Sequence, residues 1–190
     1  VCSALARRQV ERARREPLAT LESYCLLMAA VNLLHGTAWH DFDRAREMLE
    51  HLVDAQAGLL RLLEPPLAHA VPSAGYIQAY PPGVRENGGQ YSHAGVWALM
   101  AQAEYARHHG AAHGDLAYRY FTYLSPAHRS RDATQSAAYA IEPYVMAGDV
   151  YSQPPYVGRG GWSWYTGAAA WMHRAAVESL FGLQLGAHEL

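Results

Sequence analysis

The chain has 190 residues and a formal net charge of −2, and 51% of its residues are hydrophobic. This length supports one domain with a substantial core but is short for two. The weak net charge provides no single-sign field for nucleic acid or a membrane surface, so we expect no nucleic-acid partner. The first residues lack the pattern of a signal peptide, and no run reaches the roughly 18 apolar residues of a membrane span. Because the sequence begins with Val1 rather than Met, we expect a piece of a longer protein.

The two cysteines, Cys2 and Cys25, are far apart and lack a metal-type spacing. Free thiols in a reducing compartment are the simplest interpretation, which favours a cytoplasmic location. His108, His109 and His113 belong to a polar helix end and are interpreted as solvated side chains. No metal site is therefore expected.

Three helices are expected in the first part of the chain. Residues 4–16 form a charged helical run that ends before Pro17, and residues 18–34 are apolar enough for a buried helix. Asp41 is placed to cap a third helix over residues 42–55, whose apolar positions keep a helical period.

Prolines and glycines rule out a regular helix between residues 58 and 91. A stretch of about thirty residues is too long for a mere connector inside a compact domain. Its aromatic and apolar content argues against disorder, so a functional loop is predicted.

Helices alternate with irregular loops in the rest of the chain. The expected helices span 92–108, 115–124 (capped by Asp115), 142–150 and 165–180, with a polar loop at 125–134 and a second Gly/Pro loop at 152–161. This layout is typical of helical hairpins whose loops build a site at one end. We therefore expect the loops at 76–93 and 152–167 to meet.

The first motif is the segment from Tyr80 to His93, which leads directly into a helix. Its glycines let the backbone approach a ligand, and its side chains supply many hydrogen-bonding groups. The candidate sugar contacts are Arg85, Glu86, Asn87 and Gln90. His93 would lie in the first helical turn, where it is either an anion contact or a structural histidine.

The second motif, residues 158–167, combines glycines with Trp162 and Trp164 before the last helix. Thr166 and Gly167 fall where free helical N–H groups could hold an anion. The ending of a P-loop is absent, so nucleotide binding is not expected. The aromatic rings suit a sugar face, although tryptophan is also an ordinary core residue. Tyr144, in the segment Glu142-Pro143-Tyr144, is a weaker candidate, because Glu and Pro are also common where a helix begins.

Three strings carry a resemblance to a known family: GLLRLLEPP, YPPGVRENGGQYSHAGVWALMA and EPYVMAGDVYSQPPYVGRGGWSWYTGAAAWMHRA. They closely resemble the C-terminal half of the catalytic domain of glycoside hydrolase family 94, which includes cellobiose-type phosphorylases and cyclic β-1,2-glucan synthases. GVRENGGQY and GRGGWSWYTG look most like the glucan-synthase branch. Ser92 stands where Thr is common in the family.

The resemblance implies an all-α fold, part of an (α/α) six-hairpin barrel with long Gly/Pro-rich site loops. It covers residues 58–185, after a poorly placed helical segment at 1–57 and before a tail at 186–190. It implies that His93, Thr166 and Gly167 contact inorganic phosphate and that Glu86 contacts the sugar, with Arg85, Asn87, Gln90, Tyr144 and Trp164 as further sugar contacts. No cofactor is implied beyond phosphate as co-substrate.

The family's general acid is an Asp in an Asp-Trp-Asn-Asp-type motif, which this sequence does not contain. No catalytic residue is therefore expected in this chain, and its partners would be the remainder of the same catalytic domain, a β-glucan oligosaccharide and phosphate. A homodimer and a tether to the inner membrane through a longer parent are further states that the resemblance allows.

The expected chemistry is direct attack of phosphate on the anomeric carbon while the acid protonates the leaving oxygen. Two alternatives stay open. One is an inactive α-helical carbohydrate-binding fragment, and the other is an inverting hydrolase in which Glu86 or Asp149 activates water.

Overall fold

The computed structural model describes residues 50–164 and 166–183. The helices expected at 4–16 and 18–34 lie outside the described residues, as does most of the helix expected at 42–55. Within the described part of that third helix, Val53–Asp54 is strand β1, so the helix ends earlier than its apolar period predicts.

The described part of the chain is mainly helical, and its few strands contain two residues each. The all-α class expected from the sequence is confirmed at this level. In chain order the elements are β1 (Val53–Asp54), β2 (Leu59–Leu60), α4 (Tyr76–Ala79), β3 (Gln90–Tyr91), α5 (Ser92–His109), η2 (Ala111–His113), α6 (Gly114–Leu124), α7 (Pro126–Arg129), α8 (Ala133–Tyr139), β4 (Asp149–Val150), α9 (Thr166–Arg174) and η3, a π-helix (Ala175–Leu180).

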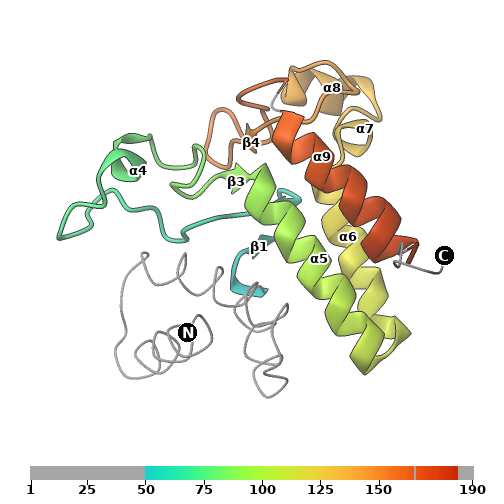
Figure 1. The fold of residues 1–190 in the computed structure, drawn as a ribbon. Helices are drawn as coiled ribbons and strands as arrows, with labels where there is room; N and C mark the ends of the chain where they lie inside the picture. Colours follow the sequence, from blue (N-terminus) through green and yellow to red (C-terminus); the bar gives the residue numbers. More distant parts are fainter. Residues whose placement is uncertain (1–49, 165, 184–190) are drawn as a thin grey trace.

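Helices α5, α6 and α9 lie side by side and enclose the main core (Figure 1). Most of the buried residues of α5 are small, so neighbouring helices approach it closely. At Gly95 an added Cβ would lie 2.7 Å from Leu124 Cδ2 of α6. The fully buried side chains of Val96, Leu99 and Tyr120 belong to this core.

Several helix limits differ from those expected. Helix α6 begins at Gly114, and Asp115 lies in its first turn rather than capping it with a side-chain hydrogen bond. The cap falls instead on Asp132, whose Oδ1 accepts from Gln135 N at 2.9 Å before α8. Residues 126–129 and 133–139 are short helices within and beyond the loop expected at 125–134.

The short helix expected at 142–150 is wrong, because its end forms strand β4. This strand pairs antiparallel with β3, Gln90 opposite Val150 and Tyr91 opposite Asp149. The pairing joins the loop before α5 to the loop before α9. No helix among the described residues is long and apolar enough to cross a membrane.

Candidate active site

The two Gly/Pro loops meet at one end of the helices, as their composition predicts. Ser92 N donates to Gly148 O at 2.9 Å, and Ser152 binds the first loop twice. Its backbone N donates to Gly83 O at 3.0 Å and its hydroxyl to Gly88 O at 2.7 Å. At Gly83 an added Cβ would lie 2.5 Å from Gln153 Cγ, so glycine is needed where the loops cross.

Asp149 is a buried residue that links the two loops by hydrogen bonds. Its carboxylate is buried and accepts from Arg85 N at 3.0 Å and from Trp162 N at 3.2 Å. Burial raises the pKa of Asp149, against the opposing effect of these two hydrogen bonds. A Cβ at Gly161 would lie 2.1 Å from Oδ1, so no larger residue fits there. Both carboxylate oxygens of Asp149 are thus engaged in holding the backbone.

Arg85 lies in the middle of an aromatic cluster. Its guanidinium carbon is 4.4 Å from the ring centroid of Trp162, and 5.4 and 5.5 Å from those of Tyr91 and Tyr80. Its Nε donates to Glu86 Oε2 at 3.4 Å. Burial disfavours the charge of Arg85, but Glu86, Tyr80 and Asp149 together outweigh this effect and the pKa of Arg85 is raised. The arginine is therefore a fixed cation whose position follows from both loops.

Asn87 and Gln90 are fully buried, and their amides hold backbone groups. Asn87 accepts from Leu67 N at 2.6 Å and donates to Tyr80 O at 2.7 Å. Gln90 accepts from Leu60 N at 2.9 Å and donates to Tyr123 O at 3.2 Å. The structure thus gives both amides a framework role, and direct sugar contact by either stays a prediction.

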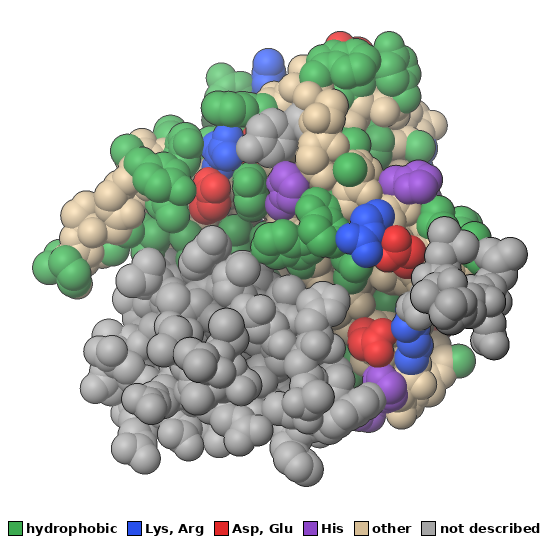
Figure 2. All heavy atoms as spheres, viewed as in Figure 1, with side chains coloured by type: hydrophobic (Ala, Val, Ile, Leu, Met, Phe, Trp, Pro, Cys, Tyr) green, Lys and Arg blue, Asp and Glu red, His purple; other side chains and the backbone are tan. Residues whose placement is uncertain are grey.

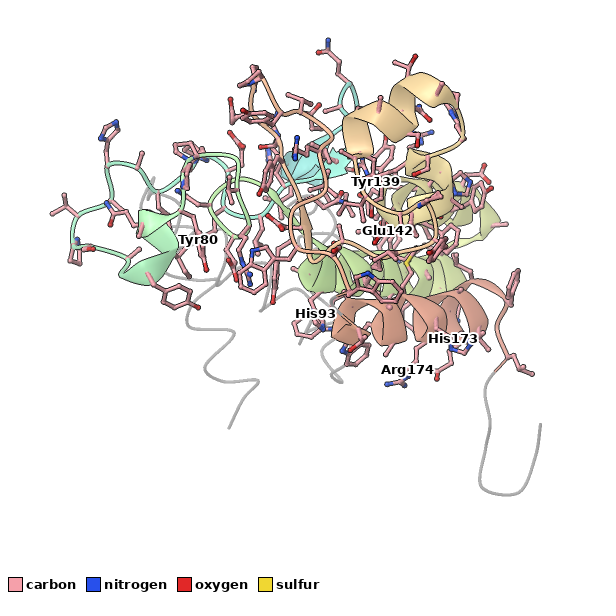
Figure 3. All side chains as sticks on the ribbon, turned by 90° about the horizontal axis from the view of Figure 1, so that it is seen from above. Tyr80, His93, Tyr139, Glu142, His173 and Arg174 are labelled. Carbon is pink, nitrogen blue, oxygen red and sulfur yellow. The ribbon has the colours of Figure 1, made fainter. Side chains whose placement is uncertain are left out.

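His93 is brought against the beginning of α9. A Cβ added at Gly167 would lie 3.0 Å from His93 Cε1 and 3.1 Å from Nε2, so the ring touches the first turn of that helix (Figure 3). Thr166 and Gly167 are exposed. Burial lowers the pKa of His93, which favours a neutral ring at pH 7. An imidazole and the N–H groups at the beginning of a helix therefore lie in the same region, and the exposed Thr166 belongs to the same helical turn.

Tyr144 and Trp164 form an exposed pair outside this cluster. Their ring centroids are 6.4 Å apart at 72°, and the side chains are 73% and 63% exposed, as a sugar platform requires. Trp164 Nε1 donates to Glu142 Oε1 at 3.2 Å, which fixes the ring. Glu142 thus orients Trp164, a role that its position beside a proline did not indicate.

Trp171 belongs to the core side of α9. Its ring packs edge-on against Trp97 of α5 at 5.8 Å and 87°. The core interpretation of tryptophan therefore holds for Trp171, whereas Trp162 and Trp164 are exposed at the site.

On the face shown in Figure 2, side chains of both charges and a histidine lie close together among hydrophobic side chains.

The sequence did not single out Tyr80 or Tyr91 as partners of Arg85, although both lie within the first motif. Among the residues that the structure describes, no group of three or more His, Cys, Asp or Glu gathers as metal ligands would.

Comparison with known proteins identifies relatives of the whole region. The catalytic-domain model of the glycosyl hydrolase 94 superfamily matches residues 22–182. The cyclic beta-(1,2)-glucan synthase NdvB of Rhizobium meliloti (strain 1021) is 43% identical over 137 residues, 72% of this chain and 5% of the relative. The solabiose phosphorylase of Paenibacillus borealis is 28% identical over 142 residues, 74% of this chain and 17% of the relative. An N,N'-diacetylchitobiose phosphorylase of Vibrio furnissii is 26% identical over 129 residues, 67% of this chain and 15% of the relative. The chain thus spans 5% to 17% of the length of these relatives.

Proposed function

Since the chain belongs to the catalytic-domain family of the glycosyl hydrolase 94 superfamily, we propose that it forms one side of the active site of an inverting phosphorylase or glycosyltransferase. The substrates are β-linked glucose oligomers, of the β-1,2-glucan type, and inorganic phosphate. The observation that carries the proposal is the contact of the His93 ring with Gly167, where α9 begins. It supports an anion-binding site on the same pair of loops as the Arg85–Glu86 pair.

In the proposed assembly, residues 58–185 are the later hairpins of an (α/α) six-hairpin barrel. The proposed boundaries of this part follow residues 57 and 185. The remainder of the catalytic domain completes the site, and a homodimer and a cytoplasmic location belong to the same proposal. The packing of α5, α6 and α9 side by side supports hairpins of this kind (Figure 1).

Phosphate binds beside the contact between the His93 ring and the first turn of α9. The helix has nine residues, so its first N–H groups and its dipole favour an anion. Thr166 adds a hydroxyl donor and His93 a ring N–H donor. Nε2 of His93 lies on the Gly167 side of the ring and is the atom placed to reach the phosphate.

The sugar lies toward the Arg85–Glu86 pair. Glu86 accepts from sugar hydroxyls while Arg85, held by three aromatic rings, keeps the carboxylate in place. Tyr144 and Trp164 present exposed rings to a further sugar unit. Polar groups at the reacting sugar and flat rings farther out are the usual division of work in a sugar site.

In phosphorolysis this chain would bind and orient the reactants, and it would supply neither a general acid nor a general base. Phosphate is already a nucleophile, so the bound anion is held in line with the anomeric carbon and no base is required. The phosphate oxygen forms the new bond as the glycosidic bond breaks, and the general acid from the rest of the domain protonates the leaving oxygen. The residues described above orient both reactants and stabilise the charge that develops.

The hydrolase alternative receives less support. Both oxygens of Asp149 accept backbone hydrogen bonds and its side chain is buried, so it is not placed to activate water. Glu86 Oε2 lies 3.4 Å from Arg85 Nε, an arrangement that suits a fixed substrate contact. A purely carbohydrate-binding role rests on the exposed rings of Trp162 and Trp164, and it predicts sugar binding that does not depend on phosphate.

The test is a set of variants in the complete enzyme. We expect His93→Ala to raise the KM for phosphate by about tenfold or more, the loss of a charge-assisted hydrogen bond, with a small change in the KM for oligosaccharide. Thr166→Ala should act in the same direction but less strongly, because backbone donors remain. Trp164→Ala is the matched control and should raise only the KM for oligosaccharide. If His93→Ala leaves the KM for phosphate unchanged while sugar binding is lost, the anion-binding site is wrongly assigned.

A further inference from the structure

A second pocket opens away from the His93 region, between the β1–β2 turn, the end of α6, helices α7 and α8, and the loop at residues 157–158. Its volume is about 370 Å³, within the range of small-molecule sites. The basic side chains that line it are His128, Arg129 and Arg131, together with the phenol of Tyr123, and no Asp or Glu lines it among the described residues. The pocket is thus basic and not balanced by acids in its wall.

Arg129 is the fixed cation of this pocket. Its Nε donates to Tyr123 O at 2.7 Å and its Nη2 to Gly58 O, so two backbone carbonyls set the guanidinium plane. Burial lowers the pKa of Arg129 to about 10, with Tyr139 acting weakly in the other direction. Desolvating a guanidinium beside carbonyls alone is costly unless an anion completes it. Arg131 also lines the pocket and is exposed, and its Nε lies 3.8 Å from Asp132 Oδ2.

Two further polar atoms near the pocket do not face it. His128 Nδ1 and Gln135 Oε1 are both shielded from solvent, so a ligand in the open pocket does not reach them. The groups that remain for a ligand are the two guanidinium groups of Arg129 and Arg131, which bind oxyanions.

From this combination we propose that the pocket binds a sugar-sized molecule that carries an oxyanion, with Arg129 and Arg131 on the oxyanion. Two guanidinium groups suit a phosphate monoester or a carboxylate. The volume accommodates one hexose ring with its charged group. The site is independent of the phosphate seat at His93.

The experiment is a titration of the full chain with glucose 6-phosphate, gluconate and glucose, followed by isothermal calorimetry and by the NMR signal of the Arg129 Nε–H. We expect saturable binding of glucose 6-phosphate or gluconate that moves the Arg129 signal, and no comparable binding of glucose. The two charged probes distinguish a phosphate from a carboxylate ligand.

Variants locate the binding. Arg131→Ala should weaken it by about tenfold, the loss of one hydrogen bond between charged groups. Arg119→Ala, an exposed arginine of α6 outside the pocket, should leave it unchanged. Arg129→Lys is a second probe, because Arg129 also holds Gly58 and Tyr123 and larger changes could disturb the fold. Absence of saturable binding, equal binding of glucose, or signal changes confined to the His93 region would overturn the proposal.

Discussion

His93 is a residue on which burial and a neighbouring helix act in opposite directions. Burial lowers its pKa below the ordinary 6.5 and favours the neutral ring. The beginning of α9 beside it attracts an anion, and a bound phosphate would favour the charged ring. The charge of His93 is therefore expected to depend on whether phosphate is bound at the beginning of α9.

This dependence can be measured by NMR titration of the His93 Cε1–H. Without phosphate we expect a pKa below 6.5, and with saturating phosphate a pKa raised by about one unit, because a neighbouring charge of opposite sign typically moves a pKa by one to three units. Sulfate-free buffer with chloride at equal ionic strength is the control. A pKa that does not respond to phosphate would contradict the anion seat.

The lowered pKa also has a consequence for stability. In the free chain the folded state binds fewer protons at His93 than the unfolded state between the lowered pKa and 6.5, so stability rises with pH across that window and is lost as the pH falls through it. His93→Gln should remove this part of the pH dependence, as measured by urea unfolding at several pH values. An identical pH profile in the variant would show that the imidazole is not desolvated.

At the scale of elements, the sequence predicted what local pattern determines. The helix expected at 92–108 is α5, and the final helix begins close to its expected start. The helix expected at 142–150 is wrong, because Asp149 and Val150 pair with residues about 60 positions earlier, and no local pattern reveals such a partner. Helix α8 went unrecognised where its polar sequence resembled a loop, although Asp132 provided a cap signal.

The crossing of the two loops at Gly83 offers a test at this scale. Gly83 and Gly158 both have φ of +86°, but an added Cβ meets Gln153 at the first and nothing within 4 Å at the second. Each Gly→Ala change should cost about 1–2 kcal/mol for the left-handed conformation, and Gly83→Ala about 1–3 kcal/mol more for the collision. The free energy of unfolding in urea measures both. Equal losses in the two variants would mean that the loops do not cross as closely as described.

At the scale of the whole molecule, sequence reasoning identified the family and the two loops but not their internal support. The strings that carried the resemblance begin near residue 58, whereas the family match begins at residue 22. The boundary expected at residues 57 and 58 stays a prediction. Asn87 and Gln90 were chosen as sugar contacts by residue type, yet their amides hold the backbone of residues 60, 67, 80 and 123. Residue type indicates that a side chain can bind hydroxyls, but only the fold decides whether backbone groups take it first.

The last prediction concerns what this chain does alone. The sequence contains no Asp-Trp-Asn-Asp motif, and the chain spans 5% of the glucan-synthase relative. A general acid contributes about 10²–10⁴-fold to such a reaction, and without it the leaving oxygen departs as a poor leaving group. We therefore expect no measurable release of glucose 1-phosphate from β-linked glucose oligomers by the purified 190-residue chain, while a protein that adds the preceding half of the catalytic domain is active. The same longer protein with the Asp of that motif changed to Asn is the matched control and should be inactive. Release at an ordinary enzymatic rate by the short chain would mean that a proton donor lies within it, and Glu86 would then be the first residue to substitute.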